Sequence, residues 1–154
     1  MAIKQMAKIA VDGFVAGVDP SEIMVQQALR CNAATMQAGR VIVKPGSISA
    51  LPYEDESFDR VCAIESFYFW PDPIAGLKEV HRVLRPGGRL VIALEWSKEM
   101  RNPKRNVIRL LAAKMGYPLY SGAEMVEMLT AAGFSQAQFQ FNPGPSWFGA
   151  IGLK

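Results

Sequence analysis

One acidic side chain directly follows a short apolar run near the start of the chain. Asp19 ends the stretch "FVAGVD", and "PSE" comes next, before a segment with helical spacing. An acid at the carboxyl end of a strand in an α/β sheet can accept hydrogen bonds from both hydroxyls of a ribose, because ligands bind in the crevice at that end. The same residues also fit a helix start, with Asp19 at the N-cap, Pro20 at the first helical position and Glu22 at the capping-box position. The local sequence leaves both roles open.

Few other side chains suggest acid, base or metal chemistry. His81, the only histidine, belongs to the helical stretch "GLKEVHRVL", and we interpret it as structural. Without acids clustered at ligand spacing, we expect neither a bound metal nor a Ser-His-Asp arrangement. Cys31 and Cys62 form no CxxC motif, so we predict neither a disulfide framework nor a structural zinc site. This cysteine usage is typical of the reducing cytoplasm.

Length and composition indicate a single domain over residues 1–154. Half of the residues are hydrophobic, which is enough for a substantial core. With 17 Lys and Arg against 14 Asp and Glu, the net charge of +3 is too small to favour nucleic acid as a partner. No apolar run approaches the ~20 residues of a membrane span, and the first residues lack a signal-peptide core, so we expect a cytoplasmic protein without stable membrane insertion.

Strand and helix patterns alternate along most of the chain. The expected strands occupy residues 14–18, 40–44, 58–64, 89–94, 135–141 and 146–154. The expected helices occupy residues 3–10, 19–31, 72–84 and 121–134, with one more around Val107, Leu110 and Leu111. This order predicts an α/β fold with a doubly wound, mostly parallel sheet and a C-terminal antiparallel hairpin. The unbroken apolar character of residues 58–64 predicts a strand that is covered on both faces.

Two longer stretches give the chain a resemblance to a known family. They are "ALPYEDESFDRVCAIESFYFWPD", a loop that leads into a buried strand, and "EVHRVLRPGGRLVIAL", a helix stop followed by a strand. With the terminal hairpin, they resemble the class I S-adenosylmethionine-dependent methyltransferases, especially those that act on small molecules. The resemblance runs from about Phe14 to Lys154. It implies S-adenosylmethionine as cofactor and a small-molecule methyl acceptor. Because a sulfonium methyl is already activated, we name no catalytic residue.

The resemblance assigns four residues to the adenosine half of the cofactor. It implies that Asp19 binds the ribose diol and that Pro20 lies against the adenine side. Ser47 and Ile48 fall in the adenine-contacting loop, where Ile48 would pack on the purine face. Ser47 stands where family members usually carry an acid, so its hydroxyl would bind the adenine amino group without the strength that a charge adds. The alternative is that Ser47 and Ile48 are turn and core residues.

The resemblance also implies roles for residues that follow two later strands. Glu65 matches the position whose backbone carbonyl faces the amino group of the cofactor. Phe67, Tyr68 and Trp70 are candidate walls of the acceptor pocket, and Trp96 is a further candidate after the next strand. Core packing is the alternative for each of these aromatic side chains.

One part of the family pattern is not found before Asp19. The family places its glycine-rich cofactor loop roughly 20 residues before the ribose-binding acid, but this stretch holds only a strand pattern, a helix pattern and Met1. The resemblance therefore implies a truncated domain without the central first strand, with impaired cofactor binding and methyl transfer. In this family the first strand lies in the sheet between the strands at residues 14–18 and 58–64, so its absence leaves a gap there. We expect this gap to be closed by pairing within the chain, or by a second copy of the chain in a homo-oligomer.

Two other function classes stay open. One is a non-catalytic methyltransferase-like remnant that acts as a binding or interaction module. The other is a nicotinamide-dependent oxidoreductase, which Asp19 would suit but the two quoted stretches would not.

Positive charge is concentrated in one segment, residues 98–114. It contains six Lys or Arg residues, with only Glu99 opposing them: Lys98, Arg101, Lys104, Arg105, Arg109 and Lys114. A solvated helix face explains many such runs. The alternative is a surface for an anionic acceptor, or for a membrane that carries a lipid substrate.

Overall fold

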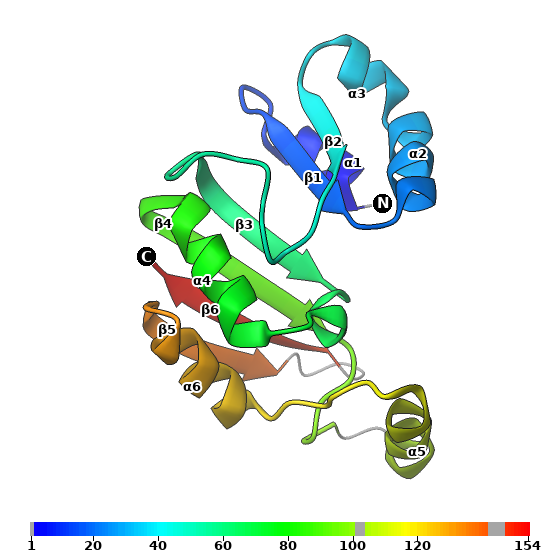
Figure 1. Cartoon of the computed structure of the whole chain (residues 1–154), viewed down its shortest axis with the longest axis vertical. Helices are drawn as coiled ribbons and strands as arrows, with labels where there is room; N and C mark the ends of the chain where they lie inside the picture. The colour runs from blue at the N-terminus through cyan, green and yellow to red at the C-terminus, as the bar shows by residue number, and fades with distance from the viewer. Residues whose placement is uncertain (1, 101–103, 142–146) are drawn as a thin grey trace. The chain divides into compact units, whose positions relative to one another are not determined.

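The computed structural model describes residues 2–100, 104–141 and 147–154. These residues form two compact units, residues 1–52 and 53–154, and each unit contains one β-sheet (Figure 1). The first sheet has two parallel strands, and the second has four strands that include the antiparallel hairpin. The mixed α/β class predicted from the sequence is confirmed. Arg101 of the basic segment and the predicted turn at "NPGP" lie outside the described residues.

The first unit is a two-stranded sheet with three helices. Its strands β1 (Val15–Asp19) and β2 (Val41–Pro45) are parallel, and Asp19 lies opposite Pro45. Its helices are α1 (Ala2–Ile9), α2 (Glu22–Cys31) and α3 (Ala33–Gln37). The short α3 was not predicted, and the other elements lie within three residues of their predicted bounds.

One apolar cluster holds the first unit together. It joins both strands to α1 and α2 through Ala7, Val15, Val25, Val41 and Val43. Both helices therefore cover the same face of the sheet. Gly17 permits close approach of α1, because a Cβ at this position would stand 2.5 Å from the Ile3 side chain.

The second unit contains the larger sheet, in the order β3–β4–β6–β5. Its strands are β3 (Phe58–Ile64), β4 (Leu84–Leu94), β5 (Ser135–Phe141) and β6 (Phe148–Leu153). Its helices are the 3-10 turn η1 (Phe67–Phe69), α4 (Pro73–Val83), α5 (Arg105–Met115) and α6 (Gly122–Ala131). β3 and β4 are parallel, whereas β6 runs antiparallel to both β4 and β5.

Helices α4 and α6 lie against one face of this sheet and against each other (Figure 1). The core between them is fully buried and includes Leu77, Leu90, Ile92, Leu94 and Leu129. Helix α6 begins at a complete capping box, in which the Ser121 side chain accepts from the Glu124 N–H and the Glu124 carboxylate accepts from the Ser121 N–H. The capped helix predicted at residues 121–134 is thus confirmed.

Strand β4 begins earlier than predicted. Its first residue is Leu84, directly after α4, although "PGG" at residues 86–88 was interpreted as a helix stop before a strand at 89–94. Leu84 pairs with Phe58 of β3, and the glycines that follow pair with the end of the chain. The Gly87 N–H donates to the Lys154 carbonyl, and the Lys154 N–H donates to the Gly88 carbonyl, at 2.8 and 3.0 Å. Gly87 adopts a φ of +77°, which glycine tolerates without strain.

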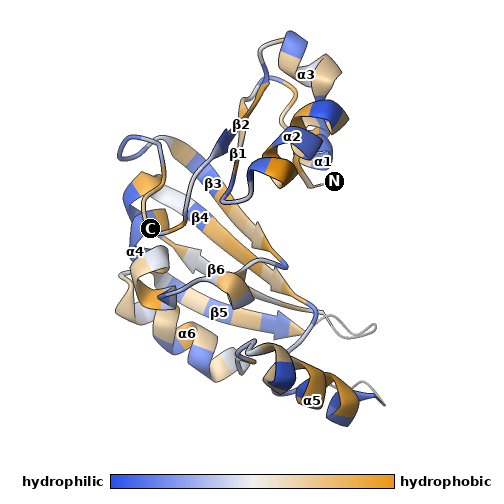
Figure 2. Ribbon diagram, turned by 45° about the vertical axis from the view of Figure 1, so that its right-hand side comes forward, coloured by the Kyte–Doolittle hydropathy of each residue, from blue (hydrophilic) through white to orange (hydrophobic). Residues whose placement is uncertain are grey.

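The prediction that residues 58–64 form a strand covered on both faces is wrong for the described residues. Only Ala63 of β3 is buried, Cys62 is exposed, and Ile64 is 42% exposed. Helices α4 and α6 cover one face, and Figure 2 shows hydrophobic stretches along β3 and β4. Among the described strands, β3 pairs only with β4, and β1 pairs only with β2. The expected closure within the chain is therefore not found among the described strands, and closure by a second copy stays a prediction.

His81 and the loop before β3 have structural partners. The His81 ring packs edge-to-face on Phe134, with centroids 5.1 Å apart, and burial lowers its pKa. Arg82 of α4 holds the loop by an ion pair of 2.7 Å to Asp55, and a second ion pair of 2.7 Å, to Glu79, lies within the helix. Within the described ranges, we find no group of three or more His, Cys, Asp and Glu side chains that could hold a metal ion, and no helix long and apolar enough to cross a membrane.

Candidate functional site

Asp19 lies at the carboxyl end of β1 and forms the turn that leads into α2. Its Oδ1 accepts the Ser21 N–H at 2.8 Å. The N-cap of α2 is Ser21, whose hydroxyl oxygen accepts from the Met24 N–H, so the alternative that placed Asp19 at the N-cap is wrong. Pro20 precedes the helix, and Glu22 is its first residue. Among the described residues, no donor is hydrogen-bonded to the second oxygen of Asp19, which leaves an acceptor for a ligand.

The predicted adenine loop lies at the same end of the two-stranded sheet. Ser47 and Ile48 follow β2 directly, and the Gly46 N–H donates to the Asp19 carbonyl at 3.2 Å. The Ser47 hydroxyl oxygen accepts from the Ser49 N–H at 3.2 Å, which leaves its second lone pair to accept and its hydrogen to donate. Ile48 is half-buried. The structure therefore brings Asp19, Ser47 and Ile48 together within one unit.

In the second unit, Glu65 connects the carboxyl ends of β3 and β4. Its N–H donates to the Ala93 carbonyl at 2.9 Å, and its carboxylate accepts the Glu95 N–H at 2.5 Å. Its φ of +51° is unusual for a residue other than glycine. Burial raises the pKa of the Glu65 carboxyl, and the neighbouring Glu95 carboxylate raises it further. Glu65 thus fixes the strand-end turn through both its backbone and its side chain.

We expect that replacing Glu65 with glutamine raises the stability of the chain at pH 7, by less than about 1 kcal/mol because the group is largely exposed. Glutamine can still accept the Glu95 N–H but carries no charge. A carboxyl pKa raised by folding favours the unfolded state once the group ionises. The gain in the free energy of unfolding should therefore vanish at pH values below the usual glutamate pKa. It should grow as the pH rises through the raised pKa of Glu65 in the folded state. Urea unfolding at several pH values measures this, and a difference independent of pH would contradict it.

Tyr68 holds the backbone of Trp96. The Tyr68 hydroxyl accepts the Trp96 N–H at 2.7 Å and donates to the Trp96 carbonyl at 3.0 Å. The Tyr68 side chain is buried, and this burial raises its pKa. Since both polar groups of the Trp96 backbone bind one hydroxyl, Tyr68 fixes the start of the segment after β4. The Trp96 side chain is half-buried.

The other aromatic side chains after β3 divide between core and surface. Phe67 is fully buried and packs on Trp70 and Tyr120, with centroids 4.7 and 5.2 Å apart. Trp70 is half-buried. Phe69, which the sequence interpretation passed over, is 58% exposed and packs edge-to-face on Tyr117. The only signal for it was its place in "SFYFWPD", because local sequence does not show which way each residue of a 3-10 turn points.

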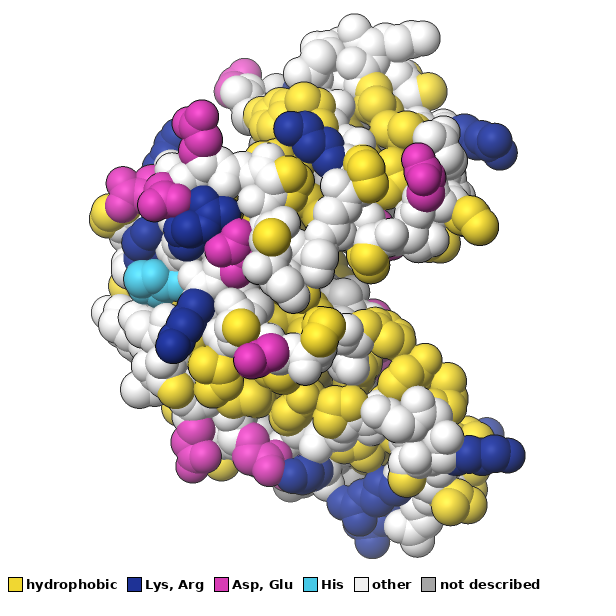
Figure 3. Space-filling view, viewed as in Figure 1, with side chains coloured by type: hydrophobic (Ala, Val, Ile, Leu, Met, Phe, Trp, Pro, Cys, Tyr) yellow, Lys and Arg dark blue, Asp and Glu magenta, His cyan; other side chains and the backbone are white. Residues whose placement is uncertain are grey.

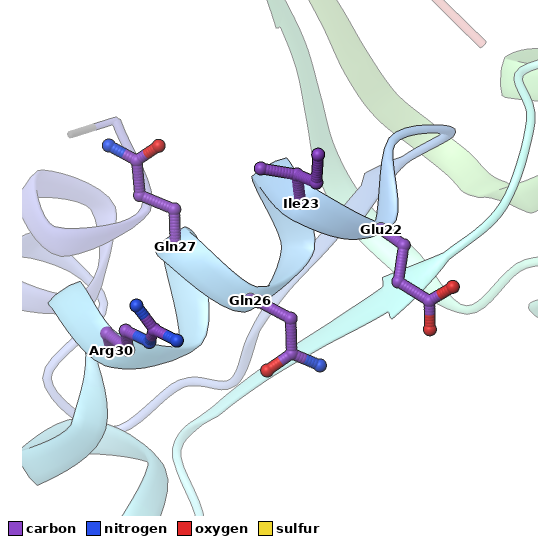
Figure 4. Close-up of a pocket in the computed structure, with 5 residues that line it drawn as sticks. All are labelled: Glu22, Ile23, Gln26, Gln27 and Arg30. Atoms are coloured by element: carbon purple, nitrogen blue, oxygen red, sulfur yellow. The ribbon is translucent and has the colours of Figure 1, made fainter.

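A shallow depression runs along α2 of the first unit. Figure 4 shows that Glu22, Ile23, Gln26, Gln27 and Arg30 line it, all from this one helix. Ligand sites combine an enclosed apolar surface with polar groups that converge from several elements. This depression has neither property, so the strand ends remain the candidate site.

A family model described as a methyltransferase domain matches residues 2–92, and this range includes parts of both units. The chain belongs to this methyltransferase family. Among curated relatives, it is 33% identical over 126 residues to the O-methyltransferase resE of Aspergillus sclerotiorum, covering 81% of this chain and 47% of the relative. It is 27% identical over 139 residues to the uncharacterized methyltransferase YdaC of Bacillus subtilis, covering 90% and 68%. The methyltransferase chain thus spans about half the length of resE.

Solved structures show the same fold. A SAM-dependent methyltransferase from Thermotoga maritima matches with a TM-score of 0.71 and 22% identity, over 92% of this chain and 81% of that one. An O-methyltransferase from Nostoc punctiforme, whose title calls it putative, matches with a TM-score of 0.81 and 18% identity, over 97% and 47%. The cofactor of this family is S-adenosylmethionine. The Asp19 oxygen that has no partner among the described residues is an acceptor of the kind that the ribose hydroxyls of this cofactor require.

Proposed function

We propose that this methyltransferase chain takes part in transferring a methyl group from S-adenosylmethionine to a small-molecule acceptor. The observation that carries the proposal is the Asp19 carboxylate, which keeps one oxygen without a partner among the described residues at the carboxyl end of β1. Ligands bind at this end of parallel strands in α/β sheets. We further propose that both units belong to one domain, which the family match to residues 2–92 supports.

In this proposal, the residues of the first unit bind adenosine. Asp19 accepts hydrogen bonds from the ribose hydroxyls, and Pro20 lies against the adenine side. Ser47 hydrogen-bonds the adenine edge and Ile48 packs on the purine face. In the second unit, the Glu65 backbone carbonyl faces the amino group of the cofactor. When bound, the cofactor supplies an activated methyl group, and these residues bind and orient it without a dedicated acid or base.

The acceptor is proposed to lie against the aromatic side chains of the second unit. Trp70 and Trp96 are its proposed walls. Trp70 and Trp96 are half-buried and offer surface, whereas Phe67 and Tyr68 support them from the core. Small-molecule chemistry is supported by the names of relatives, which include a 27-O-demethylrifamycin SV methyltransferase and a ubiquinone/menaquinone biosynthesis C-methyltransferase.

We also propose that residues 1–154 on their own hold the cofactor weakly. Among the described residues, α1 is the one element before β1. The described residues before β1 contain no glycine-rich loop. The second candidate is a methyltransferase-like module that binds a partner without catalysis.

A thermal-shift comparison distinguishes these candidates. We expect millimolar S-adenosylhomocysteine to raise the melting temperature of the chain, since a ligand that binds only the folded state stabilises it. Nicotinamide adenine dinucleotide at equal concentration should leave it unchanged. A melting temperature raised by nicotinamide adenine dinucleotide and unchanged by S-adenosylhomocysteine would favour an oxidoreductase. No shift with either nucleotide would contradict cofactor binding and favour the binding module.

A further inference from the structure

Helix α5 exposes an apolar stripe. Val107, Leu110, Leu111 and Met115 are 56, 71, 45 and 53% exposed, and the only buried residue of the helix is Ala112. Residues three, four and seven positions apart lie on one side of an α-helix, so these side chains form a continuous band. A stripe of large apolar side chains on a short helix indicates an interaction surface.

Positive charge accompanies this stripe. Residues 98–114 contain six Lys or Arg and one acidic residue, a net charge of +5, so the rest of the chain sums to −2. Helix α5 itself carries Arg105, Arg109 and Lys114 and no acidic residue. Within the described part of the chain, none of these three side chains forms an ion pair. Figure 3 shows blue and yellow side chains gathered over α5.

Contacts within the second unit hold α5 with this stripe outward. The Arg109 guanidinium donates to the Lys98 carbonyl at 2.5 Å, and Gly116 ends the helix with a φ of +72°. The Tyr117 ring, directly after the helix, packs on Phe69, with centroids 4.9 Å apart. Ala112 is buried, whereas the four side chains of the stripe are exposed.

The place of Lys114 favours a lipid surface over a protein partner. Lys114 follows Leu110 by four residues and Leu111 by three, so its side chain emerges within the apolar stripe. A protein that covered the stripe would have to bury this ammonium group, which is costly without a paired charge. At a bilayer surface, the methylene stem of a lysine lies along the acyl chains while its ammonium group reaches the phosphates.

We propose that α5 docks this chain on an anionic lipid bilayer. Val107, Leu110 and Leu111 enter the boundary between headgroups and acyl chains, and Lys114, which emerges within the stripe, binds lipid phosphates. The docking is peripheral and reversible, because one short helix presents few apolar side chains. It goes beyond the proposed function, since it requires neither cofactor nor acceptor.

Vesicle flotation of the 154-residue chain tests this proposal without any cofactor. We expect binding to vesicles of phosphatidylglycerol and phosphatidylcholine to be roughly tenfold stronger than to phosphatidylcholine alone, and to fall as salt screens the cations. Leu110→Gln and Lys114→Glu should each weaken it severalfold. Ile23→Gln is the matched control, because Ile23 is 79% exposed on α2 and should not affect binding. Circular dichroism verifies that each variant is folded.

Three outcomes would overturn the proposal. One is binding that does not depend on the anionic lipid or is absent at low salt. Another is an equal effect of Ile23→Gln and Leu110→Gln. The third is a dimer, seen by light scattering without vesicles, that Leu110→Gln dissociates, since this would assign the stripe to a protein interface. None of these results changes the thermal-shift test, so failure here is distinguishable from failure of the proposed function.

Discussion

Residues 1–154 are expected to bind S-adenosylmethionine at least about a hundredfold more weakly than a version that carries the family's first strand and glycine loop ahead of Met1. Asp19, Ser47 and Ile48 can hold the adenosine half, but no described residue before β1 replaces the glycine loop. Glycine lets the backbone approach a ligand closely because it has no side chain. Losing two or three hydrogen bonds, at roughly 1 to 3 kcal/mol each, gives a deficit of this size.

Isothermal titration calorimetry of both versions measures the difference. Circular dichroism and unfolding of each version serve as the control, because a poorly folded short chain would also bind weakly. Methyl transfer should fall with affinity or more steeply, since a loosely held sulfonium is poorly aligned with its acceptor. Micromolar affinity of the short chain would contradict the prediction. It would indicate that α1 or a second copy supplies the contacts assigned to the loop.

Replacing Asp19 with alanine is expected to weaken cofactor binding roughly tenfold to a hundredfold in the extended version. The proposed ribose contacts are two hydrogen bonds to a charged acceptor, the stronger class of hydrogen bond in proteins. The effect on folding should be smaller. In the structure, Asp19 accepts one hydrogen bond, from the Ser21 N–H, and losing it costs about 1 kcal/mol.

Ser21→Ala is the matched control for this variant. Ser21, and not Asp19, caps α2, so removing its hydroxyl costs about 1 kcal/mol of stability. It has no proposed contact with the cofactor. The two variants therefore predict similar losses of melting temperature but very different losses of affinity.

Periodicity was sufficient to predict most elements of the fold. The bounds of β3 and β5 agree with the predicted residues 58–64 and 135–141, because alternation and apolar runs are local signals. The start of β4 was not predictable in this way. Leu84 pairs with Phe58 of β3, and Gly87 and Gly88 pair with Lys154, 66 or more positions further along the chain. Only the folded structure shows these pairings.

The sequence allowed us to name candidate residues for the site, but not the hydrogen bonds that they form. The sequence interpretation named Asp19 of "DPSE" as the possible helix cap and did not consider Ser21. The structure chooses Ser21 because β1 continues through Asp19, which pairs with Pro45, so the helix starts later. Likewise, the sequence placed Tyr68 in an aromatic group, but its hydrogen bonds to Trp96 depend on a residue 28 positions away.

The most direct test of the central claim is a calorimetric titration of the extended version, its Asp19→Ala variant and its Ser21→Ala variant with S-adenosylhomocysteine. If Asp19 binds the ribose of the cofactor, Asp19→Ala loses roughly tenfold or more in affinity, whereas Ser21→Ala keeps the affinity of the unmodified protein despite its lower melting temperature. Equal affinities of all three proteins would contradict the account and leave Asp19 as a turn residue between β1 and α2.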